Sequence, residues 1–180
     1  KGLKPRDISA IIMTHTHFCH ASCLKQIKDL TKASIVVNEN EAVCLEQGSC
    51  PLPKGTRWYS GIISWLGRNV VYGIEKFQSV SPDIILNVKL DLGRYGLEGY
   101  IIPTPGHTSG SQSLIIGENA FIGDSMFGIF RNTVLPPFAD DLPVLFKSWQ
   151  ALLDTGCKSF YPGHGKVIER GRVEDELAKS

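Results

Sequence analysis

Residues 14–20 read Thr-His-Thr-His-Phe-Cys-His, which places four side chains of metal-ligand type within six residues. The run follows residues 8–13, whose apolar side chains predict a buried strand. Because side chains repeat every two residues on an extended backbone, His15 and His17 point to the same side and can bind one metal ion. His20 comes three residues later, where the chain turns, and can face the same cavity. The spacing therefore predicts a metal site at the end of this strand.

Cys19 lies between these histidines, and its thiolate would be a strong zinc ligand. The plainer interpretation is a set of surface histidines in a polar turn, and the close spacing of four potential ligands argues against it. The remaining cysteines are predicted to pack in the core or in loops. They are Cys23, Cys44, Cys50 and Cys157.

Three more side chains of metal-ligand type follow apolar strands later in the chain. His107 lies in a Thr-Pro-Gly-His-Thr turn, Asp124 follows Phe-Ile-Gly, and His164 lies in Pro-Gly-His-Gly. Taken alone, His107 could be a turn residue bonded to the backbone, and Asp124 could be a helix cap. The repeated order of strand, turn and ligand makes all three candidate ligands.

The composition restricts the classes of function. The chain has 180 residues, 42% of them hydrophobic, which predicts a single domain over residues 1–180 with a buried core. Its net charge of +1 gives no strong field for nucleic acid, and its apolar runs are too short to span a membrane. Five cysteines at irregular spacing do not resemble a disulfide framework, so we expect a cytoplasmic protein. We also expect a small-molecule substrate.

Strand and helix patterns alternate along the chain and predict a layered α/β or α+β fold. The predicted strands are 8–13, 34–37, 83–90, 97–102, 112–116, 119–123 and 158–161. The predicted helices are 21–32, 40–47, 140–155 and 172–179. Residues 48–82 predict a long loop with one helical turn near 61–66. Its aromatic part, 57–72, either lines a pocket for an apolar substrate or packs on the core.

In order and spacing, the motifs of this chain resemble those of the metallo-β-lactamase superfamily. They are HTHFCH at 15–20, TPGHTSGS at 104–111, FIGDSMF at 121–127 and YPGHG at 161–165. The second and third resemble those of glyoxalase II-like hydrolases in particular. The resemblance covers nearly the whole chain. It implies an α/β fold of the αββα type, in which two sheets pack face to face between helices and carry a dinuclear metal site at one edge.

The resemblance also assigns the metal ligands. The first metal would be bound by His15, His17 and His107. The second would be bound by His20 and His164. Asp124 would bridge the two metals.

The family motif H-x-H-x-D-H has Asp where this chain has Cys19. Cys19 and Asp124 are therefore the candidate catalytic residues, because these positions hold the metals and orient the attacking hydroxide in the family. A sulfur ligand favours zinc and disfavours manganese or catalytic iron. The site could hold two zinc ions with Cys19 as a ligand, hold one zinc ion, or be degraded, and the cysteine could be natural or introduced.

The implied activity is that of a zinc-dependent hydrolase. A metal-bound hydroxide would attack an ester, thioester, lactone, lactam or phosphodiester. One alternative is a metal-binding or interaction module with a degraded active site. Another is a mononuclear iron oxygenase of the persulfide dioxygenase type, with His15, His107 and Asp124 as ligands.

A second departure from the family concerns the first sheet. Several strands normally precede the first histidine motif, whereas 14 residues precede His15 here. We therefore expect a first sheet that is incomplete at its N-terminal side or completed by another chain. An open sheet edge of that kind predicts a homodimer.

Overall fold

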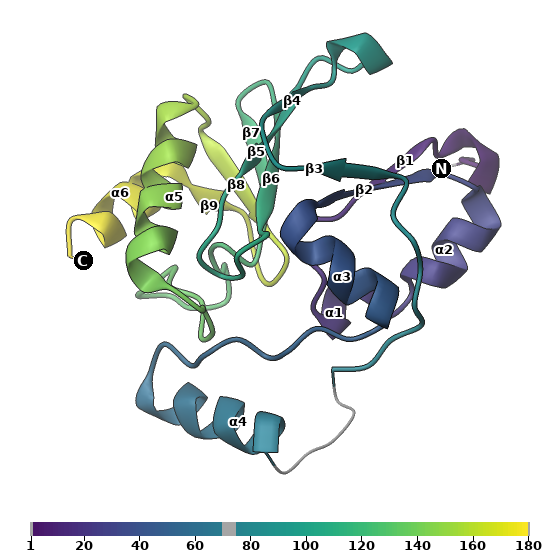
Figure 1. Cartoon of the computed structure of the whole chain (residues 1–180). Coiled ribbons are helices and arrows are strands. Elements are labelled where there is room, and N and C mark those ends of the chain that lie inside the picture. The colour runs from purple at the N-terminus through teal and green to yellow at the C-terminus, as the bar shows by residue number, and fades with distance from the viewer. Residues whose placement is uncertain (1, 70–74, 180) are drawn as a thin grey trace.

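Two β-sheets packed face to face form the centre of the computed structural model, which describes residues 2–69 and 75–179 (Figure 1). Helices cover the outer face of each sheet, so the order of layers is helices, sheet, sheet, helices. The αββα architecture predicted from the sequence is confirmed.

The first sheet has three parallel strands in the order β1–β2–β3. They are β1 (Ala10–Ile12), β2 (Ser34–Asn38) and β3 (Ile84–Leu86). Four consecutive residues of β2 are buried, as expected for a strand that is covered on both faces. Within the described residues β1 forms one edge of this sheet. The homodimer expected at that edge stays a prediction.

The second sheet has six strands in sequence order, and all neighbours are antiparallel except β7 and β8. They are β4 (Leu90–Asp91), β5 (Tyr100–Pro103), β6 (Gln112–Ile116), β7 (Asn119–Gly123), β8 (Ser159–Pro162) and β9 (Ile168–Glu169). In β7, Ala120 and Ile122 are buried while Phe121 is exposed, which is the alternation of a strand with one covered face.

Three helices lie on the first sheet: α1 (Phe18–Ala21), α2 (Leu24–Thr31) and α3 (Glu39–Gln47). The helix predicted at 21–32 corresponds to α2, which begins three residues later, and the short helix α1 before it was not predicted. Asn38 caps α3 by accepting a hydrogen bond from the Asn40 backbone N–H at 3.0 Å. The helix ends at Gly48, whose φ of 67° reverses the chain.

Two helices, α5 (Leu142–Asp154) and α6 (Arg170–Leu177), cover the second sheet. Asp141 caps α5 by accepting from the Val144 N–H at 3.0 Å, and the helix buries Trp149 completely. The Trp149 indole N–H donates to the Ser125 carbonyl at 2.7 Å, which fixes the loop after β7 against the helix. The helix predicted at 140–155 is confirmed.

The strand predicted at 83–90 is wrong in its extent. Its first half forms β3 in the first sheet, and its last residue begins β4 in the second sheet. The exposed residues 87–89 cross between the sheets. The pattern of apolar residues does not show whether a stretch stays in one sheet or passes to another. The sequence therefore did not predict that residues 83–90 would divide between β3 and β4. Short 3₁₀ turns occur at Pro5–Asp7 and Gly93–Tyr95.

Residues 48–82 also differ from the prediction, because they contain the twelve-residue helix α4 (Trp58–Asn69) and not a single turn. Figure 1 shows α4 lying apart from the two-sheet body. Ser64 on its inner face donates to the Pro53 carbonyl at 2.7 Å, while Trp58 and Trp65 are 81% and 60% exposed. The aromatic side chains therefore do not pack on the core as one interpretation expected. Residues 70–72 of the aromatic segment lie outside the described residues.

No helix in the described part of the chain has the length and apolar character needed to cross a bilayer.

Candidate metal centre

The candidate ligands gather where strands of both sheets end. His15 and His17 follow β1, and His107, Asp124 and His164 follow β5, β7 and β8. The structure thus brings together side chains that are 149 positions apart (164 − 15) in the sequence. They form two groups of ligand atoms, each with its members within 4.8 Å of one another. One group is His15, His17 and His107, and the other is Cys19, His20, Asp124 and His164.

The first group is a buried set of three imidazoles. His107 Nε2 lies 3.0 Å from His17 Nδ1, and the rings of His15 and His107 meet edge to face with centroids 4.7 Å apart. His107 Nδ1 lies 2.8 Å from the Phe138 carbonyl oxygen. Donation of the Nδ1 proton to that carbonyl leaves the lone pair on Nε2, which faces the other histidines.

The second group surrounds the carboxylate of Asp124. Oδ1 lies 3.2 Å from His20 Nε2, and Oδ2 lies 3.5 Å from His164 Nε2. Oδ2 also lies 3.9 Å from His15 Nε2 and 3.8 Å from His107 Nε2, in the first group. Asp124 is therefore the side chain that faces both groups, while Cys19 is exposed at the outer side.

These residues fit a metal centre. The ring atoms Nε2 of His15 and His17 are buried and have no hydrogen-bond partner, which is costly in a protein interior. Two ligands that bind one zinc ion at about 2.1 Å in tetrahedral geometry lie roughly 3.4 Å apart. The distances of 3.0 to 3.9 Å between the ligand atoms are those expected around a shared ion.

Burial sets the protonation of the first group. Removal from water, together with the neighbouring histidines, lowers the pKa of His15 well below its usual value. Burial and His107 lower the pKa of His17 to about 3, although Asp124 opposes this effect. Burial also lowers the pKa of His107. All three imidazoles are therefore neutral at pH 7, the form that binds a metal.

In the second group, neighbouring charges outweigh burial in setting the pKa values. Burial alone would lower the pKa of His20, but the Asp124 carboxylate and Cys19 outweigh it and raise this pKa to about 10. Burial would raise the pKa of Asp124, and the surrounding histidines, His20 first, lower it instead. Without a metal, His20 and Asp124 therefore form an ion pair at neutral pH, and a metal at this position must displace the proton of His20.

A glycine allows these side chains to approach one another. A Cβ atom on Gly163 would lie 2.5 Å from Asp124 Oδ1 and 2.5 Å from His20 Cε1. The Gly that precedes His164 in the Pro-Gly-His-Gly turn is therefore required by the close contact of two other candidate ligands.

Sequence reasoning missed Glu41, which lies behind the histidines on α3. Its side chain is buried at 2% exposure, and its Oε2 accepts from the Thr16 backbone N–H at 2.8 Å and from the Thr16 hydroxyl. Its Oε1 accepts from the Thr108 hydroxyl at 2.6 Å. An acidic residue in a predicted helix is usually exposed, so the sequence carried no signal for this role.

A cavity of about 330 Å³ opens onto the centre. Of the candidate ligands, His17, Cys19, His107, Asp124 and His164 line it, whereas His15 and His20 do not. The remaining walls are apolar and consist of Phe18, Leu52, Pro53, Phe127 and Phe138. No described residue of α4 lines this cavity. This helix therefore does not form the pocket wall that was one of the two expectations for the aromatic segment.

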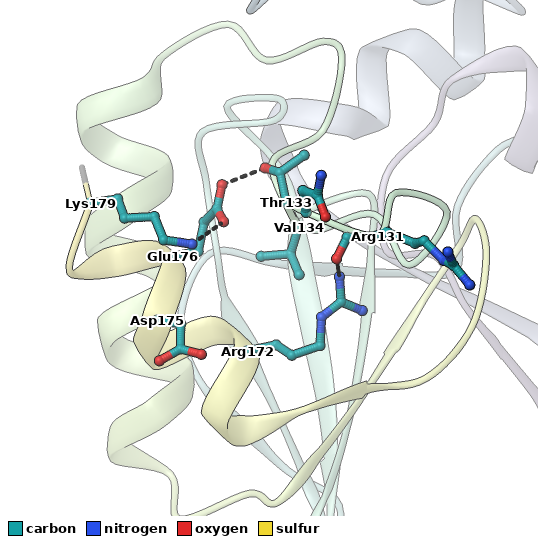
Figure 2. Close-up of a pocket in the computed structure, with 8 residues that line it drawn as sticks. Arg131, Thr133, Val134, Arg172, Asp175, Glu176 and Lys179 are labelled. Carbon is teal, nitrogen blue, oxygen red and sulfur yellow. Dashed lines mark hydrogen bonds and ion pairs between the residues drawn. The ribbon is translucent and has the colours of Figure 1, made fainter.

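A second hollow of about 320 Å³ lies beside α6 and has no set of metal ligands (Figure 2). Figure 2 shows Glu176, Lys179 and Arg172 in interactions within the chain, whereas the carboxylate of Asp175 has no interaction drawn. Glu176 accepts from the Thr133 hydroxyl and pairs with Lys179, and Arg172 donates to the Phe130 carbonyl at 2.8 Å.

Helices enclosing two sheets, with His, Asp and Cys side chains gathered at the strand ends, define a class of metal-binding hydrolases. This chain belongs to the metallo-beta-lactamase superfamily, whose family model matches residues 1–164. The resemblance found in the motifs is confirmed.

Curated relatives carry the same class of name. The chain is 29% identical over 171 residues to a probable metallo-hydrolase of Methanocaldococcus jannaschii, with 92% of this chain and 73% of the relative covered. It is 25% identical over 175 residues to a metallo-beta-lactamase fold-containing protein of Sulfurisphaera tokodaii, with 93% and 64% covered. The chain thus spans between 64% and 73% of the length of these two relatives.

Solved structures share the fold. An archaeal metallo-beta-lactamase superfamily protein from Sulfolobus tokodaii superposes with a TM-score of 0.67 at 21% identity, covering 95% of this chain and 67% of that one. A B3 metallo-beta-lactamase also gives 0.67 at 21% identity, covering 93% and 74%. A third structure, described as di-iron-bound, gives 0.65 at 21% identity, covering 93% and 75%.

Proposed function

We propose that this chain is a zinc-dependent hydrolase with one or two metal ions at the histidine centre. The substrates would be small molecules with an ester, thioester, lactone, lactam or phosphodiester bond. The observation that carries the proposal is the convergence of buried imidazole and carboxylate atoms in two groups, in which His15 Nε2 and His17 Nε2 have no hydrogen-bond partner. Membership of the superfamily and the metallo-hydrolase names of its relatives support the reaction class.

Each group of ligand atoms would hold one metal. His15, His17 and His107 form the first site, and Cys19, His20 and His164 the second. Asp124 would serve both, because Oδ2 lies 3.5 Å from His164 Nε2 and 3.8 Å from His107 Nε2. When bound, the metal supplies a Lewis acid and makes water nucleophilic at neutral pH.

The residues of the chain supply orientation and exclusion of water. The Phe138 carbonyl accepts the Nδ1 proton of His107 and so directs Nε2 toward the centre. Asp124 directs a second carboxylate oxygen, Oδ1, toward His20 Nε2 at 3.2 Å and so orients the ring of His20. No serine or cysteine nucleophile is required, because water would be the nucleophile and the histidine, aspartate and cysteine side chains would serve as metal ligands.

Cys19 determines which metal the second site prefers. A thiolate is a soft ligand, whereas the aspartate that the family has at this position is hard, so zinc is favoured over manganese. Because Cys19 is exposed, its sulfur can reach an ion at the mouth of the cavity.

The cavity walls indicate the kind of substrate. Phe18, Phe127 and Phe138 form apolar surfaces next to the ligands, which favour an acyl or aryl group beside the bond to be cleaved. The net charge of +1 gives no support for a nucleic acid substrate.

The mononuclear iron oxygenase is the weaker alternative. It would use His15, His107 and Asp124 and would leave Cys19, His20 and His164 without a role. These three side chains lie within 4.8 Å of one another and of Asp124, which favours a second metal.

Metal content and hydrolysis, measured together, test the proposal. The purified chain, its Cys19→Asp variant and its His107→Ala variant are analysed for metals by plasma mass spectrometry. Each is then assayed with a p-nitrophenyl ester, an acyl thioester, a lactone and bis-p-nitrophenyl phosphate. We expect zinc and turnover in the unmodified chain, and His107→Ala should lose the zinc ion of the first site together with turnover.

The Cys19→Asp variant separates the remaining interpretations. Two zinc ions in both forms would make Cys19 a ligand. A single ion that rises to two in Cys19→Asp would make the cysteine a defect of the second site. Absence of metal and of turnover from both would overturn the hydrolase and favour an interaction module.

A further inference from the structure

A pair of thiols lies next to the metal centre without being part of it. The sulfur atoms of Cys44 and Cys50 and a carboxylate oxygen of Glu41 are all within 4.8 Å of one another. Both thiols are free. Cys44 is partly exposed on the last turn of α3, whereas Cys50 is 6% exposed.

The fold holds these two residues together. Gly48 adopts a left-handed conformation after α3 and turns the chain back along the helix. The Ser49 N–H donates to the Cys44 carbonyl at 3.2 Å, and the Cys50 N–H donates to the Glu75 carbonyl at 3.4 Å. Their proximity is therefore fixed by backbone hydrogen bonds on both sides and does not depend on side-chain rotation alone.

A metal is not the natural occupant of this cluster. Both carboxylate oxygens of Glu41 already accept hydrogen bonds, from Thr16 and from Thr108. A metal bound there would break bonds that hold the two histidine loops, and the cluster offers only three ligands among the described residues. Two adjacent thiols without a metal are a dithiol, whose characteristic chemistry is oxidation.

The two thiols differ in a way that suits sequential oxidation. The Cys50 thiol lies against Cys44 and lowers the pKa of Cys44, although burial and Glu41 oppose this. The same contact with Cys44, together with burial, raises the pKa of Cys50. Cys44 is thus the more nucleophilic of the two and also the one that solvent reaches.

We propose that Cys44 and Cys50 form a peroxide-sensitive disulfide. The Cys44 thiolate attacks a hydroperoxide, the O–O bond breaks, and Cys44 becomes a sulfenic acid while hydroxide or an alkoxide leaves and takes up the proton that the Cys44 thiol released. The Cys50 sulfur then attacks the Cys44 sulfur, the S–O bond breaks, and the Cys50 proton goes to the departing water. Overall, two thiols lose two electrons and two protons, and the peroxide is reduced.

The crosslink would act on the wall of the active-site cavity. Pro51, Leu52 and Pro53 follow Cys50 directly, and Leu52 and Pro53 line the cavity beside His17 and Cys19. A bond from Cys50 to the end of α3 would restrict that wall. The formation of the disulfide itself does not depend on hydrolysis, so its test is independent of the proposed function.

Tryptic mass spectrometry provides the test, because the peptide of residues 33–54 contains these two cysteines and no other. The reduced chain is exposed to hydrogen peroxide, unreacted thiols are blocked with N-ethylmaleimide, and the protein is digested. We expect the peptide to remain unlabelled, to be lighter by two hydrogen atoms, and to take two labels after reduction. This change should occur at least about tenfold faster than oxidation of Cys157, which is fully buried.

Three variants make the assignment specific. In Cys50→Ser the reaction should stop at a sulfenic acid on Cys44, which dimedone traps. In Cys44→Ser, Cys50 should stay reduced, and Cys157→Ser should leave disulfide formation unchanged. Two labels on the wild-type peptide, at a peroxide dose that oxidises Cys19 or Cys23, would overturn the proposal. Protection of both thiols from labelling by zinc alone, without loss of hydrogen, would overturn it in favour of a metal site.

Discussion

The hydroxyl of Thr108 donates a hydrogen bond of 2.6 Å to the buried carboxylate of Glu41. Thr108 follows His107, so this bond attaches one histidine loop to α3. The other carboxylate oxygen of Glu41 accepts from Thr16, which lies between His15 and His17. One side chain therefore sets the position of both loops that form the first metal site.

Replacement of Glu41 by Gln should loosen this site. An amide has one accepting oxygen, so one of the two threonines would face a donor, which costs roughly 1–3 kcal/mol of unfolding free energy. Loss of such a support usually lowers metal affinity by about 10 to 100-fold. Urea denaturation and zinc competition with a chromophoric chelator measure the two effects. Glu39→Gln, an exposed change on the same helix, should alter neither.

The two metal sites should respond differently to pH. The pKa of His17 is lowered to about 3, so a first ion displaces no imidazole proton at pH 7. The pKa of His20 is raised to about 10, so a second ion must displace a proton there. Affinity for the second ion should therefore rise by about tenfold per pH unit between pH 7 and 9, while affinity for the first stays nearly constant.

Zinc titration calorimetry in buffers of different ionisation enthalpy counts the protons released. The variant His20→Gln removes the titrating imidazole and should weaken the pH dependence of the second step. An equal slope for both ions in the unmodified chain would contradict the assignment of His20 to the second site.

The metal-free chain should lose stability as the pH falls below the value of an unfolded histidine. Burial keeps His17 neutral in the folded state down to a pKa of about 3, whereas in the unfolded chain it takes up a proton near pH 6.5. The stabilisation is therefore fully present above pH 6.5 and is lost as the pH falls toward 3. Each such histidine contributes a slope of roughly 1 kcal/mol per pH unit.

Urea denaturation at pH 7 and at pH 5.5 checks this expectation. His20 opposes part of this loss, because its pKa is raised to about 10 and its stabilising contribution grows as the pH falls through 6.5. The three histidines of the first group, whose pKa values are all lowered, outweigh it. His17→Gln should reduce the dependence on pH. Zinc at saturating concentration should stabilise the chain more at pH 7 than at pH 5.5, because protons compete with the metal.

The sequence predicted that the candidate ligands lie close together, and it predicted the class of the fold. His107, Asp124 and His164 each follow a strand in a short turn, and strand ends on one edge of a layered fold converge. That local pattern was sufficient to predict a common cluster. The role of Glu41 depends on hydrogen bonds to residues 25 and 67 positions away, which no local pattern contains.

The helix α4 shows a second limit of local patterns. Its apolar residues predicted contact with a core or a pocket, yet Trp58 and Trp65 are largely exposed. The buried hydroxyl of Ser64 bonds instead to the Pro53 carbonyl in the preceding segment. Periodicity reports which residues share a face but does not identify what that face contacts. Glycines in the segment further weakened the helical signal.

Gly163 offers a direct test of the second metal site. A Cβ at this position would lie 2.5 Å from Asp124 Oδ1 and from His20 Cε1, so Gly163→Ala must displace one of these side chains. We expect the variant to fold and to bind the first zinc ion but to lose the second. Gly171→Ala is the matched control, because an added Cβ there meets nothing within 4 Å. It lies in α6, where alanine should stabilise the helix by about 0.5–1 kcal/mol.

The two variants are compared by zinc content and by thermal unfolding with and without zinc. Gly163→Ala should bind one zinc ion fewer than Gly171→Ala and should gain less thermal stability from added zinc. Equal zinc content in both variants would mean that the contact between Asp124 and His20 does not control the second site. Loss of all metal from Gly163→Ala would mean that Asp124 is indispensable to the first site as well, as its position 3.8 Å from His107 Nε2 allows.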